Sequence, residues 1–89
     1  PTALKSTIAK YSSSANVSLT WAASADNVSV AGYNIYRNGN KVGVTNRTGT
    51  SFSNTISGSA KGALYTYDVR AFDAEGNLSD RSNYASVVF

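Results

Sequence analysis

Residues Tyr65-Thr-Tyr-Asp-Val-Arg-Ala71 decide which kind of fold this chain adopts. Their large apolar side chains alternate with polar ones, and a period of two is that of a β-strand with one buried face. No segment of the 89 residues keeps an apolar pattern of helical spacing over three turns. The stretch therefore predicts a long strand of an all-β fold, with Tyr65, Tyr67 and Val69 facing the core.

Shorter alternating stretches on both sides of this segment predict six further strands. Val17, Leu19 and Trp21 alternate with Ser and Thr, and Tyr33 and Ile35 alternate with polar residues in the same way. Asn38-Gly39 separates two extended runs, and because both residues tolerate positive φ, this pair is a strong hairpin signal. Turn signals about every 8–12 residues favour an antiparallel sandwich. The other strands are expected at about 4–8, 17–21, 32–37, 41–45, 50–55 and 85–89.

The order and spacing of five motifs in this pattern resemble a fibronectin type III domain. The motifs are Val17-Ser-Leu-Thr-Trp21, Asp26-Asn-Val28, Gly32-Tyr-Asn-Ile-Tyr-Arg-Asn-Gly39, Tyr65-Thr-Tyr-Asp-Val-Arg-Ala71 and Asp73-Ala-Glu-Gly-Asn-Leu-Ser79. The nearest resemblance is to the bacterial accessory modules of secreted chitinases, cellulases and other polysaccharide-degrading enzymes. It covers essentially the whole chain and implies an immunoglobulin-like, seven-stranded Greek-key sandwich.

The resemblance also implies roles for individual core residues. Trp21 is similar to the family's core tryptophan of the second strand, Tyr33 and Ile35 to the inward pair of the third strand, and Tyr65 to the tyrosine-corner residue, whose hydroxyl bonds a nearby loop. Ser59 stands where the family usually has Leu before the corner, so the loop before Tyr65 departs from the pattern. The core predicted from alternation and resemblance together contains Leu19, Trp21, Tyr33, Ile35, Phe52, Tyr67, Val69 and Val87.

The composition argues against catalysis and against several classes of partner. There is no His to act as general base and no Cys to bind a metal or form a disulfide. The formal net charge of +3 comes from scattered Lys and Arg, without the basic stripe of a nucleic-acid-binding face. No apolar run approaches the roughly 20 residues that span a bilayer. We therefore expect no enzyme, no cofactor, no nucleic acid and no membrane contact.

Acidic side chains in the predicted loops raise the question of a calcium site. Five loop residues carry suitable oxygen ligands, but no dense Asp-x-Asp run is present among them: Asp26, Asn27, Asp73, Asn77 and Asp80. Asp73 and Glu75 lie in a turn rich in Ala and Gly, where Asp usually bonds its own turn backbone. The structural interpretation is preferred, and no metal site is predicted.

Four aromatic residues have no clear place in the core and are predicted to contact a carbohydrate or a protein: Tyr36, Phe72, Tyr11 and Tyr84. Aromatic faces stack on sugar rings, so two or three of them in a row would form a binding platform. The alternative is that these rings cover sheet edges or pack under loops. A contact with a neighbouring domain through Tyr36, Arg37, Arg70 and Tyr84 is a further hypothesis.

The function expected from the resemblance is that of a spacer. Because the chain begins at Pro1 and contains no Met, we expect residues 1–89 to be one domain cut from a longer, secreted multidomain protein. The domain would be a monomer that holds a catalytic and a carbohydrate-binding domain on an insoluble polysaccharide. Two alternatives stay open, namely a weak polysaccharide-binding module that uses exposed aromatics and a cell-surface adhesion or protein-interaction domain.

Overall fold

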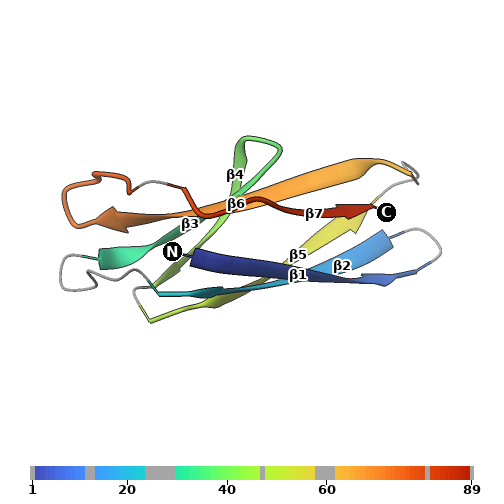
Figure 1. Cartoon of the computed structure of the whole chain (residues 1–89), viewed down its shortest axis with the longest axis horizontal. Helices are drawn as coiled ribbons and strands as arrows, with labels where there is room; N and C mark the ends of the chain where they lie inside the picture. The colour runs from blue at the N-terminus through green and yellow to red at the C-terminus, as the bar shows by residue number, and fades with distance from the viewer. Residues whose placement is uncertain are drawn as a thin grey trace.

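Two antiparallel β-sheets pack face to face in the computed structural model of the chain (Figure 1). The structure describes residues 2–11, 14–23, 30–46, 48–57, 62–79 and 81–88. Its seven strands are β1 (Thr2–Lys10), β2 (Ser14–Ala22), β3 (Val30–Arg37), β4 (Asn40–Asn46), β5 (Ser51–Ser57), β6 (Leu64–Asp73) and β7 (Ala85–Val88). In the described part of the chain, no helix has the length and apolarity needed to cross a lipid bilayer.

The strand order confirms the predicted seven-stranded Greek-key sandwich. One sheet has the order β1-β2-β5 and the other the order β4-β3-β6-β7, so the chain changes sheets after β2, β4 and β5. Asn38 and Gly39 have φ values of 51° and 85° and join β3 to β4, as the hairpin signal predicts. Asn38 is also tied to β6, because its backbone N–H donates to the Thr66 carbonyl and its Oδ1 accepts from the Thr66 N–H.

The core lies between the sheets and is lined by the inward face of each strand. The fully buried large side chains are Tyr33, Tyr67, Leu19, Ile35, Val17 and Val69, and Trp21 and Val87 are also buried. Trp21 meets the ring of Tyr33 edge-on, with the ring centroids 5.7 Å apart. The predicted core did not include Leu4, Ala15, Val30 and Ile56, which are buried as well.

Two residues predicted to face the core are only half-buried. The ring of Phe52 packs against Gly43, where a larger residue would clash with it, at the side of the sandwich formed by β4 and β5. Tyr65 packs at the margin of the core beneath the guanidinium of Arg37, 5.7 Å from the ring centroid. Ser59 and its neighbours lie outside the described residues, so the tyrosine-corner role of Tyr65 stays a prediction.

Strands β1 and β7 form the opposite side of the sandwich and run in the same direction (Figure 1). The pairing of β1 with β2 is interrupted between Thr2 and Lys5, where Ala3 has a φ of 54°. The side chain of Asn83 fills this interruption, since its Oδ1 accepts from the Leu4 N–H at 2.9 Å and its Nδ2 donates to the Leu4 carbonyl at 3.0 Å. A single amide therefore joins the edges of the two sheets.

Candidate functional site

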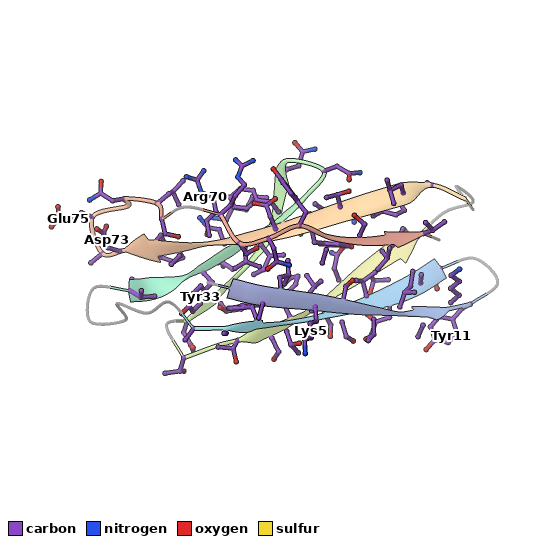
Figure 2. All side chains as sticks on the ribbon, in the orientation of Figure 1. Lys5, Tyr11, Tyr33, Arg70, Asp73 and Glu75 are labelled. Atoms are coloured by element: carbon purple, nitrogen blue, oxygen red, sulfur yellow. The ribbon has the colours of Figure 1, made fainter. Side chains whose placement is uncertain are left out.

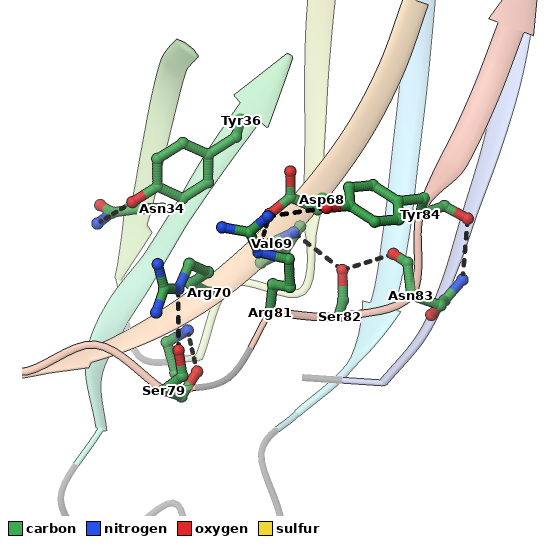
Figure 3. Close-up of polar contacts among 11 residues, drawn as sticks. Asn34, Tyr36, Asp68, Val69, Arg70, Ser79, Arg81, Ser82, Asn83 and Tyr84 are labelled. Atoms are coloured by element: carbon green, nitrogen blue, oxygen red, sulfur yellow. Dashed lines mark hydrogen bonds and ion pairs between the residues drawn. The ribbon is translucent and has the colours of Figure 1, made fainter. Parts of the chain in front are cut away.

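The four surface aromatics do not form one row. Tyr11 is 61% exposed and lies at the end of the molecule opposite Asp73 and Glu75 (Figure 2). Phe72 is half-buried, and its ring lies against Gly32, where a Cβ atom would come within 2.7 Å of the ring. The remaining two, Tyr36 and Tyr84, come near each other around Arg81 on the outer face of the four-stranded sheet (Figure 3).

The segment before β7 builds this part of the outer face. The Ser82 N–H donates to the Val69 carbonyl at 2.7 Å, and its hydroxyl accepts from the Val69 N–H at 2.9 Å. Ser79 makes the same pair of bonds with Ala71, at 2.8 and 2.9 Å. Two serines thus replace strand pairing along the edge of β6 and hold Arg81, which directly precedes Ser82, in place.

Asp68 is the centre of a charged group that we call the outer-face cluster: Tyr36, Asp68, Arg70, Arg81 and Tyr84. Asp68 is paired with Tyr36 across β3 and β6, so their side chains share the outer face. Its side chain is nevertheless only 5% exposed, and its Oδ2 lies 3.8 Å from Nε of Arg81. Burial raises the pKa of the Asp68 carboxyl, and the positive charges of Arg81 and Arg70 oppose this shift.

Hydrogen bonds hold both arginines of the cluster (Figure 3). Arg70 donates from Nε to the Ser79 carbonyl at 2.9 Å, and Arg81 donates from Nη1 to the Tyr84 hydroxyl at 2.8 Å. That hydroxyl is the main reason why the pKa of Arg81 is raised. Tyr36 is held from the other side, because its hydroxyl accepts from Nδ2 of Asn34 at 3.3 Å.

A pocket of about 180 Å³ opens within this cluster and is lined by Tyr36, Gly39, Asp68, Arg70 and Arg81. At roughly 30 Å³ per water molecule, it has room for about six waters, the space of one small ring. Two guanidinium groups face one carboxylate there, so the described lining carries a net charge of +1. The pocket combines hydrogen-bond donors, a buried acceptor and an aromatic ring, which is the composition of a polar binding site.

Arg37 does not belong to this surface, and grouping it with Tyr36 was wrong. Arg37 lies two residues after Ile35 and therefore on the same inward face of β3 as Tyr33 and Ile35. Its Nη1 donates to Oδ1 of Asn54 in the opposite sheet at 2.9 Å. The Tyr67 hydroxyl donates to the same oxygen at 2.8 Å, and burial is the main cause of its raised pKa. Arg37 therefore joins the two sheets at the margin of the core.

The acidic turn after β6 has the structural role that its composition predicts. Oδ1 of Asp73 accepts from the N–H groups of Glu75 and Asn77, and Oδ2 accepts from Nδ2 of Asn77. These bonds, with those from Asn77 the strongest, lower the pKa of Asp73. Among the described residues, no group of three or more acidic, His or Cys side chains lies close enough to hold a metal ion. Asp26, Asn27 and Asp80 lie outside the described residues.

Sequence reasoning missed Asp68, Arg81 and Ser82, which organise the site. Alternation gave no signal for Asp68, because it occupies a polar position of the strand, as Thr66 and Arg70 do, and period two predicts it to be exposed. Arg81 and Ser82 lie in a stretch without strand periodicity, so nothing local distinguishes them from other loop residues.

This chain is similar to one protein family and to segments of several bacterial enzymes. The family model of carbohydrate-binding module 48 (isoamylase N-terminal domain) matches residues 7–85. Chitinase A1 of Niallia circulans is 49% identical over 72 residues, which are 81% of this chain and 10% of that protein. An alpha-amylase of the same species is 44% identical over 97% of the chain, and exoglucanase B of Cellulomonas fimi is 46% identical over 74% of it, in each case 6% of the relative.

Solved structures with this fold include modules from bacterial proteins. A Fn3-like protein from Clostridium thermocellum has a TM-score of 0.67 and 28% identity, and the match covers 97% of this chain and 86% of that one. The Clostridium perfringens spore cortex lytic enzyme SleM has a TM-score of 0.73 with 20% identity over 99% of this chain and 28% of its own. The chain spans between 6% and 13% of the length of the first curated relatives it matches.

Proposed function

Because the chain belongs to the family of carbohydrate-binding module 48 (isoamylase N-terminal domain), we propose that it is a non-catalytic accessory module of a polysaccharide-degrading enzyme. Its partners are then the neighbouring domains of the same longer chain, to which it contributes geometry rather than chemistry. The enzyme is extracellular, because insoluble polysaccharides are too large to enter a cell. The module acts as a monomer.

The observation that carries the spacer role is the breadth of its relatives. Segments 40–49% identical to this chain lie within proteins named as chitinases, an alpha-amylase and exoglucanases, and one 41% identical lies within a poly(3-hydroxybutyrate) depolymerase. The polymers in these names differ in linkage, in monomer and even in chemical class. A role common to such enzymes does not depend on recognising one polymer, and holding domains at a fixed separation is such a role.

The shape of the module suits this role. The molecule measures 42 × 20 × 17 Å, and β1 and β7 run in the same direction along its long axis (Figure 1). The described chain thus starts nearer one end and finishes nearer the other, so flanking domains are held apart. Separation on a polymer surface sets the effective concentration of a catalytic domain around the place where a binding domain is anchored.

The test replaces the module in the full-length enzyme by a Gly/Ser linker of about 60 residues, whose mean end-to-end distance matches 42 Å. The linker can span the length of the module but removes its rigidity. We expect lower activity on the insoluble polymer and unchanged activity on soluble oligosaccharides. Full activity of the linker variant on the insoluble polymer, or an equal loss on both substrates, would contradict the spacer role.

Weak polysaccharide binding is the second candidate, and the 57% exposure of Tyr84 beside Tyr36 favours it. Its test is a pull-down of the 89-residue chain on chitin, cellulose, xylan and starch, with Tyr36→Ala as the variant. Retention on one polymer that is lost in the variant would establish binding and name the polymer. If the chain is retained on none of these polymers, the binding role is rejected and the spacer role remains as the proposed function.

A further inference from the structure

The carboxylate of Asp68 is largely covered and keeps contact with solvent at the outer-face pocket, since its oxygens are not among the fully buried polar atoms without a partner in the described residues. Its side chain is 5% exposed, and its contact with Arg81, at 3.8 Å, is longer than a hydrogen bond. No other group among the described residues donates to it. Buried carboxylates normally accept several hydrogen bonds, because losing hydration without replacement is costly. Since Asp68 lines the outer-face pocket and no described residue donates to it, a molecule bound there can donate hydrogen bonds to it in place of solvent.

The two arginines of the same pocket offer N–H donors and positive charge, and so require an anionic acceptor. Nε of Arg70 is engaged by the Ser79 carbonyl, and its two Nη groups have no partner among the described residues. Nη1 of Arg81 is engaged by Tyr84, which restricts its rotation. Because these bonds fix both guanidinium groups before any ligand arrives, little side-chain entropy is lost on binding. The end of a guanidinium matches a carboxylate in two parallel bonds.

We propose that the outer-face pocket binds one uronic acid residue, with its carboxylate on Arg70 and Arg81 and its ring hydroxyls donating to Asp68. A single molecule then neutralises the net charge of +1 and supplies the donors that Asp68 lacks. The pocket of about 180 Å³ has room for one sugar ring, and Tyr36 on its wall provides an aromatic surface for that ring.

Other occupants satisfy only part of this lining. A neutral hexose offers hydroxyls to Asp68 but leaves the second guanidinium without a counter-charge. A simple anion, or an acidic side chain of a protein, balances the arginines but brings no donor to Asp68. The inference goes beyond the spacer role, which needs no ligand, so failure of one leaves the other intact.

The test is an NMR titration of ¹⁵N-labelled chain at neutral pH and constant ionic strength. Glucuronate and galacturonate are compared with glucose and galactose, which lack the carboxylate, and with acetate, which lacks the hydroxyls. We expect saturable shifts at the amides of 66–72 and 79–84 with a uronate, and affinities for the neutral sugars and acetate at least about tenfold weaker. Raising the salt concentration should weaken uronate binding.

Three variants complete the experiment. Arg70→Gln and, separately, Arg81→Gln should each weaken uronate binding about tenfold or more, and the 52% exposure of the Arg81 side chain makes that variant the safer one for folding. Lys5→Gln is the matched control, because Lys5 lies on the opposite sheet and points away from the cluster (Figure 2). It should bind as the unmodified chain does.

Each other outcome would overturn the proposal. Equal affinity for glucose would remove the arginines from recognition, and equal affinity for acetate would make the pocket a general anion site. Shifts that stay linear for both uronates, or an Arg81→Gln variant that binds normally, would mean that no uronate site exists there.

Discussion

Truncating Trp21 to alanine should nearly unfold the protein. The side chain is 6% exposed and packs in the core, edge-on to Tyr33 with an interplanar angle of 63°. Alanine would leave a cavity that the two sheets can close only by moving together. Because β2 pairs with both β1 and β5, such a movement would disturb the whole three-stranded sheet.

The magnitude follows from the burial. An aromatic side chain buries about 150–250 Å², which at about 25 cal/mol/Å² corresponds to about 4–6 kcal/mol as an upper estimate. Large-to-small changes of buried aromatic residues cost about 3–5 kcal/mol. At about 0.05–0.15 kcal/mol per residue, a chain of 89 residues has a free energy of unfolding of about 4–13 kcal/mol. The loss is therefore a large fraction of the total stability.

Urea unfolding followed by far-ultraviolet circular dichroism measures this loss without relying on tryptophan fluorescence. With a slope of about 1 kcal/mol per molar urea, the midpoint of Trp21→Ala should fall by about 3 M or more. Trp21→Phe is the control, and it should cost less than about 2 kcal/mol because the indole Nε1 has no partner among the described residues. A Trp21→Ala variant within about 1 kcal/mol of the unmodified chain would refute the central role of Trp21.

Two further predictions concern polar groups. Asn83→Ala removes both bonds to the Leu4 backbone and should lower the free energy of unfolding by about 1–3 kcal/mol. The loss should be seen as a lower melting temperature and as faster hydrogen exchange at the Leu4 amide. Unchanged exchange would show that the Asn83 side chain is not needed there. The pKa of Asp68 is raised above its ordinary value of 3.8, so the folded state binds this proton more tightly and Asp68 makes stability fall as the pH rises through the window above 3.8. The pKa of Asp73 is lowered, so its contribution is present above 3.8 and is lost as the pH falls below it. Melting curves are measured from pH 2 to 7. As the pH rises, the melting temperature of Asp68→Asn should increase relative to that of the unmodified chain, and that of Asp73→Asn should decrease relative to it. The same trend in both variants would contradict these pKa shifts.

The strands and their buried faces are predictable because alternation is a local property of the chain. Leu19 and Trp21, or Tyr67 and Val69, are two residues apart, so a strand must place both on one side of its sheet. The Asn38-Gly39 hairpin is equally local, because it depends on the φ angles that these two residues tolerate. These signals suffice for a seven-stranded sandwich and for most of its core.

The site depends on contacts that alternation does not contain. Period two places Asp68 on the outer face and so predicts exposure, but the segment before β7 brings Arg81 across that face and the carboxylate is buried. Asn83 reaches β1 through a bulge that no local signal marks.

Alternation in the sequence thus assigns each side chain to one side of its own sheet, because it reflects the geometry of neighbouring residues alone. What covers each side is decided when segments far apart in the chain pack together. Ser79 and Ser82 hold the segment after the turn against β6, and the charged pocket of Asp68, Arg70 and Arg81 exists only as a consequence of that packing.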